Sequence, residues 1–191
     1  MGNRQHIEST VVMGIGGAGS QVLATLAEHP HSRAMQLIHV NTDAAALRDC
    51  TGPVRALHIG PSEEAAGSPA AGGDAAHYSA QAISRALHGA TQLYVLAGLG
   101  GGTGTGACVE IARMAIQQGL VVNALVLTPF GWEGAQRQQR AQTGVAALHA
   151  LGCALTVVSN AEKAATLAPD MPFDAASRTM HAELLALGGL A

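Results

Sequence analysis

The stretch AGLGGGTGTGACVE, residues 97–110, constrains the fold of this chain more than any other. Six of its fourteen residues are glycine and two others are threonine. Glycine inside regular structure costs about 0.5–1 kcal/mol per position relative to alanine, so a cluster this dense indicates a backbone that must stay bare. An apolar, strand-like run (92–98) leads into the stretch and a helical pattern (107–119) follows it. We therefore expect a strand, a glycine-rich turn and the N-terminus of a helix.

The rest of the chain repeats this alternation of strand and helix patterns, with a turn-rich loop expected at 61–74. Strands that alternate with helices predict an α/β fold: a doubly wound parallel sheet, Rossmann-like, in three α/β/α layers. We expect the strand order 3-2-1-4-5-6, in which strands 1 and 4 flank the switch point. The expected strands are 9–15, 35–40, 54–59, 92–98, 120–130 and 153–160, and the expected helices are 20–29, 44–49, 76–89, 107–119, 133–150 and 173–191.

The length predicts one domain, because 191 residues are too few for two domains of ordinary size. A hydrophobic content of 48% against 12% charged residues is typical of a globular chain. We expect a single domain over residues 1–191, with 1–8 as a flexible N-terminus and 174–191 as a terminal core helix.

Charge and apolar patterning argue against two classes of partner. Ten basic residues against thirteen acidic ones give a net charge of −3, which is not typical of a protein that binds nucleic acid. No apolar run reaches about 18 residues and no signal-peptide pattern is present, so we expect no membrane span and a cytoplasmic location. Cys50, Cys108 and Cys153 lack metal-ligand spacing and are expected to be reduced and mostly buried.

Two glycine-rich turns each open a helix after a strand. The first, GIGGAGSQ, carries Gly14, Gly16 and Gly19 in a G-x-G-x-x-G pattern, and the second is the stretch 97–110. The first N–H groups of a helix have no partner within it and lie at the positive end of its dipole, so they bind anions. No lysine precedes Lys163, which excludes the P-loop motif. We therefore predict a nucleotide whose phosphates are held by backbone N–H groups, hydroxyls, a metal ion and an arginine.

The first turn alone leaves alternatives open. With Asp43 at the end of the next strand, it also fits the dinucleotide fingerprint, in which an acid binds the ribose. It fits a purely structural tight turn equally well. In the expected strand order both turns face the same crevice, and two converging turns favour a triphosphate over a dinucleotide.

Six motifs in order resemble the tubulin and FtsZ family, in its bacterial FtsZ form. The strongest is GGGTGTG (100–106), which is similar to the family's signature loop. The others are GIGGAGS (14–20), similar to the first phosphate loop; VNTDAAAL (40–47), similar to the second loop; AAGGD (70–74), at the loop that senses the γ-phosphate; PFGWEGAQR (129–137), similar to the ribose and phosphate segment; and VVSNAE (157–162), similar to a strand end with a nucleotide-contacting asparagine.

The resemblance implies a domain that binds GTP or GDP with Mg²⁺, and a role for each matching residue. Asp43 would lie near the Mg²⁺ ion, through water. Glu133 would hold the ribose hydroxyls, Arg137 a phosphate, Asn160 the ribose or base, and Phe173 would stack on the base. The residues implied around the phosphates are Gly16, Gly17, Ala18, Gly19, Ser20 and Gln21 in the first loop; Ala71, Gly72 and Gly73 at the γ-phosphate; and Gly100, Gly101, Gly102, Thr103, Gly104, Thr105 and Gly106 in the signature loop.

Several of these residues also have an ordinary structural interpretation. Glu133 and Arg137, four residues apart, fit a surface ion pair. Asn160 fits a cap for the following turn. Asp43 fits the N-cap of the next helix, which is compatible with ligand binding.

One departure from the family concerns the base. The family carries an acid five residues after the stacking phenylalanine, whereas this chain has Arg178 five residues after Phe173. Arginine has no acceptor for the guanine N–H groups, and Asp174 is the nearby alternative. Gln21 replaces an asparagine of the family. We still predict GTP or GDP over ATP.

The second departure is at the C-terminus. In the family the last helix leads into a loop whose acids position the attacking water on the nucleotide of the next subunit. This sequence stops within the helix, at LLALGGLA. The resemblance therefore implies a protein that binds GTP and hydrolyses it slowly alone. It would act as a regulator or partner in FtsZ-type cell division, with full-length FtsZ or another copy of itself.

Two alternatives remain. One is a self-assembling GTPase that uses Asp74 or Glu133 as its acid. The other is an NAD-binding oxidoreductase domain, although no His or Tyr pair is convincingly placed for it. His39, His58 and His77 are expected to be scattered surface or edge residues.

Overall fold

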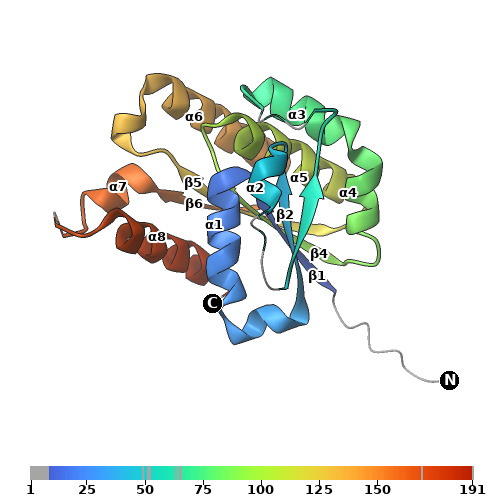
Figure 1. The fold of residues 1–191 in the computed structure, drawn as a ribbon, viewed down its shortest axis with the longest axis horizontal. Helices are drawn as coiled ribbons and strands as arrows, with labels where there is room; N and C mark the ends of the chain where they lie inside the picture. Colours follow the sequence, from blue (N-terminus) through green and yellow to red (C-terminus); the bar gives the residue numbers. More distant parts are fainter. Residues whose placement is uncertain are drawn as a thin grey trace.

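The computed structural model describes residues 9–48, 50, 53–62, 64, 66–168 and 170–190. Its strands are β1 (Thr10–Ile15), β2 (Met35–Asn41), β3 (Val54–His58), β4 (Gln92–Gly98), β5 (Val121–Thr128) and β6 (Ala154–Ser159). They form a six-stranded sheet in the order β3-β2-β1-β4-β5-β6 (Figure 1), in which all neighbouring strands are parallel. This confirms the predicted doubly wound sheet and its strand order. The segment 1–8, predicted to be flexible, lies outside the described residues.

Helices cover both faces of the sheet and give the three α/β/α layers (Figure 1). They are α1 (Gly16–Ala27), α2 (Ala44–Arg48), α3 (Pro69–Tyr78), α4 (Ala80–Ala86), α5 (Cys108–Gln117), α6 (Ala135–Ala150), α7 (Asn160–Ala164) and α8 (Phe173–Leu187), with 3₁₀ turns η1 (Pro30–Ala34) and η3 (Gly131–Glu133) and a π-helical turn η2 (Thr103–Ala107). Val12, Leu37 and Leu96 pack with α1 and α8 on one face. Met13 and Val95 pack with α3 to α6 on the other. Because neighbouring residues of a strand point to opposite faces, strands covered on both faces are apolar throughout.

Helix α1 begins at Gly16, directly after β1, and not at residue 20 as predicted. Gly16 has a φ of +70°, a conformation that favours glycine, so the chain turns from strand to helix within one residue. Gly19 then lets α1 lie close to β4, because a Cβ there would overlap the carbonyl oxygen of Leu96. The first glycine turn therefore fixes both the start of α1 and its distance from the sheet.

Helix α3 corrects the prediction of a loop over 61–74, because it begins within that segment at Pro69. Ser68 is its N-cap and accepts a hydrogen bond from the Ala71 N–H at 3.2 Å, and a proline at the first helical position is favourable. Gly72 lies inside the helix because a Cβ there would overlap the carbonyl oxygen of Gly102. The turn-forming residues of this segment thus serve a helix start and a close helix contact.

Other element boundaries differ from the predictions in smaller ways. The helix predicted over 76–89 is divided at Ser79, whose hydroxyl accepts a hydrogen bond from the Gly60 N–H at 2.9 Å. The helix predicted from residue 133 begins at Ala135, after Gly134 with a φ of +96°. The short helix α7 was not predicted. Within the described residues, no helix is both long and apolar enough to cross a membrane.

Candidate functional site

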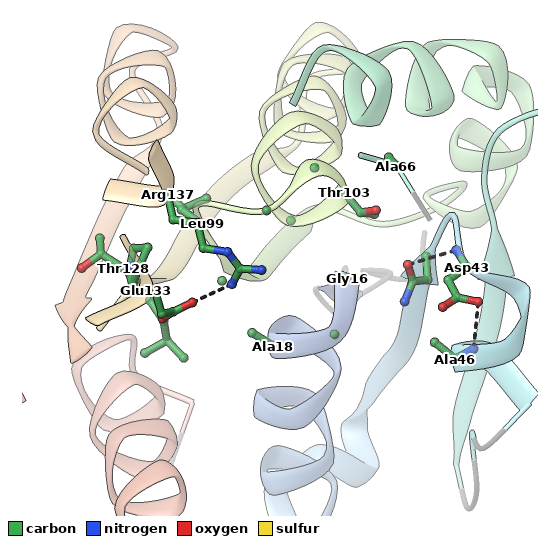
Figure 2. A pocket seen from close by; sticks show the side chains of 18 of the residues that line it. Gly16, Ala18, Asp43, Ala46, Ala66, Leu99, Thr103, Thr128, Glu133 and Arg137 are labelled. Atoms are coloured by element: carbon green, nitrogen blue, oxygen red, sulfur yellow. Dashed lines mark hydrogen bonds and ion pairs between the residues drawn. The ribbon is translucent and has the colours of Figure 1, made fainter. Parts of the chain in front are cut away.

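A polar cavity lies at the carboxyl ends of the central strands, where the sheet order reverses between β1 and β4. It has a volume of about 410 Å³. Figure 2 shows Asp43 on one side of it and the Glu133–Arg137 pair on the other, with the start of α1 between them. Ligands of open parallel sheets bind at such switch points. The lining residues are Gly16, Gly17, Ala18, Asn41, Asp43, Ala46, Ala66, Gly98, Leu99, Gly101, Gly102, Thr103, Gly104, Leu127, Thr128, Pro129, Glu133, Arg137 and Asn160.

The N-terminus of α1 forms the floor of this cavity. Gly16, Gly17 and Ala18, its first three residues, line the cavity. No described side chain caps this end of the helix, and its first turn carries no acidic residue. The first N–H groups of a twelve-residue helix are thus left for a ligand, and they favour an anion.

Four of the five glycines of the signature loop, residues 100–106, fall into two kinds. A Cβ at Gly102 would overlap the Ala66 carbonyl oxygen, one at Gly104 the Gly98 carbonyl oxygen, and one at Gly106 the Pro69 carbonyl oxygen. The lack of a Cβ at these three glycines allows the loop backbone to lie close to the backbone of Ala66, Gly98 and Pro69. Gly101 differs, because a Cβ there would have no atom within 4 Å and the residue lines the cavity. Much of the glycine content of the loop therefore serves packing, and Gly101 presents bare backbone to the cavity.

The loop threonines hold the loop in shape. The Thr103 hydroxyl is hydrogen-bonded to the Thr42 hydroxyl at 2.7 Å, in a buried position. Thr42 Oγ1 also accepts a hydrogen bond from the Ala66 N–H at 2.9 Å. Thr105 Oγ1 accepts from the N–H of Gly100 at 2.8 Å, where φ is +109°. Thr103 lines the cavity, whereas Thr105 does not.

Asp43 has the ordinary structural role that the sequence allowed. Its Oδ1 accepts hydrogen bonds from the N–H groups of Ala45 at 2.9 Å and Ala46 at 3.4 Å, at the start of α2. The Asp43 N–H in turn donates to Oδ1 of Asn41 at 3.2 Å. None of the hydrogen bonds recorded for the described residues uses Asp43 Oδ2. The two oxygen-bearing side chains fit a hard cation such as Mg²⁺, which binds oxygen ligands and keeps several waters.

Glu133 and Arg137 form the expected i,i+4 ion pair, and both line the cavity (Figure 2). Arg137 Nη1 donates to Glu133 Oε2 at 2.6 Å, and Glu133 Oε1 accepts from the Phe130 N–H at 2.8 Å. Glu133 lies in η3 rather than on the helix with Arg137. Gln138 Nε2 donates to the Phe130 carbonyl at 2.9 Å, which ties this segment to α6.

Asn160 does not cap the turn that follows it, so that interpretation is wrong. Ser159 is the N-cap of α7, and its hydroxyl accepts from the Glu162 N–H at 3.2 Å. Asn160 lines the cavity, and its Oδ1 is buried without a hydrogen-bond partner among the described residues. A buried polar atom of this kind is costly unless something binds it, so it points to a ligand.

Some predicted site residues lie outside this cavity. Gln21 and Phe173 line a separate cavity of about 420 Å³ between α1 and α8, together with Asp174 and Arg178. Ala71 lines another cavity, beside α3. Gly19 and Gly72 are packing positions. The predicted residues absent from the lining of the cavity at the strand ends are Gly19, Ser20, Gln21, Ala71, Gly72, Gly73, Gly100, Thr105, Gly106 and Phe173.

The sequence reasoning missed part of the lining. Asn41 and Thr128 are the last residues of β2 and β5, and Pro129 follows β5. Parallel strands end at one edge of the sheet, so the residues at these ends could have been named from the predicted order. No pattern in the sequence indicated Ala66, because its place at the cavity depends on the hydrogen bond from its N–H to the Thr42 hydroxyl.

Two histidines are buried, whereas His77 is exposed as expected. His39 is only 4% exposed and His181 only 6%. The prediction of His39 as a surface or edge residue is wrong, because β2 lies between β1 and β3 and is covered by α1. Burial lowers the pKa of both imidazoles. His181 Nδ1 lies 3.3 Å from the hydroxyl of Thr25 and links α8 to α1.

Comparison with known proteins agrees with this geometry. Residues 9–166 match the model of the Tubulin/FtsZ family, GTPase domain. Cell division protein FtsZ of Mycoplasmopsis pulmonis (strain UAB CTIP) is 34% identical over 152 residues, which are 78% of this chain and 38% of that protein. The match confirms the resemblance that the glycine–threonine loop indicated.

Solved structures of related proteins have the same fold. An empty FtsZ dimer of M. jannaschii superposes with a TM-score of 0.85 at 31% identity, covering 98% of this chain and 55% of that one. CetZ2 of Haloferax volcanii, in a GTPγS-bound protofilament, gives a TM-score of 0.80 at 25% identity, covering 95% of this chain and 57% of that one. This chain therefore spans little more than half the length of these solved relatives.

Proposed function

This chain belongs to the GTPase domain of the tubulin/FtsZ family, and from that premise we propose that it binds GTP and GDP in the cavity at the end of the sheet. The observation that carries this proposal is that the uncapped N-terminus of α1 and the bare backbone of Gly101 line the same cavity. Backbone N–H groups from two glycine-rich turns at one cavity suit a chain of phosphates. The buried, unpartnered Oδ1 of Asn160 supports a ligand that also carries hydrogen-bond donors. Titration with a fluorescent ribose-labelled GTP, followed by energy transfer from Trp132, tests this proposal.

The remaining walls of the cavity fit the other parts of a nucleotide. Glu133 accepts hydrogen bonds from the Phe130 N–H and from Arg137. In this proposal Glu133 holds ribose hydroxyls and Arg137 holds a phosphate. Asp43 and Asn41 present oxygens for a water-bound Mg²⁺ ion, which would neutralise phosphate charge. Phe173, 60% exposed, lines the cavity between α1 and α8 and is available to stack on a base.

Base selectivity should be weak in the wild type, because Arg178 lines the cavity between α1 and α8, which we call the base cavity and where a guanine base would need an acceptor. We expect GTP to be preferred over ATP by less than the roughly 10⁴-fold that a hydrogen-bonding site achieves. Arg178→Asp should raise the ratio of GTP to ATP affinity at least about tenfold, since a carboxylate accepts from the guanine N–H groups. Competition titrations against both nucleotides measure this ratio.

The control for this change is Arg85→Asp, an exposed charge reversal on α4, across the sheet from the base cavity. It should leave the ratio unchanged. A wild-type preference above about 10⁴-fold would mean that another acceptor, such as Asp174, reads the base. An unchanged ratio in Arg178→Asp would mean that Arg178 does not face the base.

Hydrolysis by this polypeptide alone should be slow, and we propose that it acts as a regulator or partner in FtsZ-type assemblies. Among the described residues that line the cavity, the carboxylates are Asp43 and Glu133. Asp43 caps α2, and both oxygens of Glu133 accept hydrogen bonds. Asp74 lines a different cavity. Positioning the attacking water is a separate requirement from cradling the phosphates, so a partner subunit would supply that acid.

A phosphate-release assay across protein concentrations tests this role. We expect low turnover per molecule that does not rise with the concentration of the protein. Turnover that rises with its own concentration would instead support the self-assembling GTPase. Asp74→Asn should leave the low rate unchanged, because Asp74 lines a different cavity, and loss of turnover in that variant would make Asp74 the catalytic acid.

A further inference from the structure

A further cavity lies beside α1 and β2, and Ala46, Cys50 and Val54 also line it. It shares Ala46 with the nucleotide cavity and shares Gln21, Ala24 and Glu28 with the cavity between α1 and α8. Its volume is about 410 Å³. His39 on β2 and Cys50 both line it, and His39 Nδ1 lies 3.1 Å from the Cys50 sulfur. His39 is 4% exposed, and its Nε2 is buried without a partner among the described residues. The His39 imidazole therefore lies in the cavity wall, with the Cys50 thiol as its hydrogen-bond partner.

The protonation state of His39 leaves one ring nitrogen with a lone pair. Burial lowers the pKa of the imidazole, so the ring is neutral near pH 7 and carries a lone pair on one nitrogen. In the tautomer with the proton on Nε2, that lone pair lies on Nδ1 and faces the Cys50 sulfur. A thiol beside such a base reacts faster, because the thiolate is the nucleophile.

The other two cysteines have environments that suppress reactivity. Cys108 is fully buried, and burial raises the pKa of its thiol to about 12. Cys153 donates a hydrogen bond to the Leu148 carbonyl at 3.4 Å, and burial raises the pKa of its thiol. Each lacks an imidazole partner among the hydrogen bonds of the described residues. The reaction rates of the three thiols can therefore be compared within one molecule.

We propose that Cys50 is a site of thiol modification, at which a low-molecular-weight disulfide forms a mixed disulfide with the protein. The Cys50 sulfur attacks one sulfur of the small disulfide, the bond between the two small sulfurs breaks, and a new bond joins Cys50 to the attacked sulfur. Cys50 and the attacked sulfur end as a disulfide, and the other small sulfur is reduced to a thiol. His39 Nδ1 takes the proton from Cys50, and that proton ends on the leaving thiol.

The charge in the cavity selects among small disulfides. Glu28 is the carboxylate among the described residues that line it, and no lysine or arginine joins it there. A negative wall favours neutral disulfides or those that carry amino groups over those that carry carboxylates. The expected class is therefore a small disulfide of the aminothiol type.

The experiment exposes the folded protein to cystamine and follows the modification of each cysteine by peptide mass spectrometry. We expect Cys50 to react at least ten times faster than Cys153, and Cys108 to react last. 3,3′-Dithiodipropionate, the carboxylate counterpart of cystamine, should react several-fold more slowly at Cys50, and Glu28→Gln should narrow that difference. In urea the three cysteines should react alike.

His39→Gln tests the role of the imidazole and should slow the reaction of Cys50 at least tenfold. Circular dichroism checks that the variant is folded. If it is not, the comparison of the three cysteines in the wild type decides the question alone. A Cys50 rate no greater than that of Cys153 would overturn the proposal, as would an unchanged rate in folded His39→Gln. Equal rates with the two disulfides would overturn the assigned class of ligand.

Discussion

Replacing Gly106 by alanine is expected to lower the free energy of unfolding by about 3 kcal/mol, the upper part of the range for overpacked interiors. The added Cβ would overlap the Pro69 carbonyl oxygen and lie 2.7 Å from the Gly73 nitrogen. Both obstacles are backbone atoms of α3, so no side chain can turn away to make room. Either α3 must move from the signature loop or the loop must bend. Urea denaturation followed by circular dichroism measures the loss.

Gly101→Ala is the matched control in the same loop. A Cβ there would meet no atom within 4 Å, so its free energy of unfolding should stay within about 0.5 kcal/mol of the wild type. If Gly106→Ala unfolds at the same urea concentration as Gly101→Ala, with an unchanged slope, the contact between α3 and the loop is not a tight one. The packing account of these glycines would then be wrong.

The arrangement of the sheet was predictable because its signals are local. Each strand shows as a short apolar run, and the alternation with helices dictates a parallel sheet with both faces covered. The switch point followed from that order, and with it the expectation that the turns after β1 and β4 share a cavity. Gly16 and Gly101, one from each turn, do line the same cavity.

The packing partners were not predictable, because they are distant in sequence. Gly72 and Gly106 read as turn formers or phosphate contacts when taken alone. Their structural reason is the close contact of α3 with the signature loop, through the carbonyls of Gly102 and Pro69. The same holds for Thr103, whose hydroxyl is hydrogen-bonded to Thr42, 61 positions away in the sequence. The turn-forming residues of 61–74 therefore predicted a loop where helix α3 begins.

The candidate site was predictable where a family motif covers the segment after a strand, as it does after β2, β5 and β6. Asp43, Glu133, Arg137 and Asn160 all line the cavity. The residues that would contact the base could not be predicted from the sequence, because Arg178 departs from the family pattern on which the other site predictions were based. Its position beside Phe173 in the cavity between α1 and α8 comes from the packing of those helices.

The second large effect is expected from alanine at the two open glycines of the nucleotide cavity. Gly17 and Gly101 line the cavity, and a Cβ at either would contact no protein atom within 4 Å. The methyl groups would occupy space that the phosphates need. We expect the double variant Gly17→Ala, Gly101→Ala to bind GTP at least tenfold more weakly, about 1.4 kcal/mol. Its stability should not fall, since alanine replaces glycine within a helix at position 17.

The control for this double variant is Gly131→Ala. Gly131 is exposed and does not line the cavity, and a Cβ there would meet no atom within 4 Å. The affinity of this variant for GTP should equal that of the wild type. The contrast between the two variants separates a methyl group within the cavity from a methyl group on the surface.

The most direct measurement uses Trp132, the only tryptophan in the chain, which precedes the cavity residue Glu133. Its side chain is 75% exposed. Titration of the protein with a fluorescent ribose-labelled GTP, with excitation of Trp132, follows energy transfer to the bound nucleotide. We predict a saturable signal with one nucleotide per chain that unlabelled GTP and GDP displace, that NAD⁺ does not displace, and that the Gly17→Ala, Gly101→Ala variant weakens at least about tenfold. The absence of a saturable signal, displacement by NAD⁺, or equal affinity in the double variant would contradict nucleotide binding in this cavity.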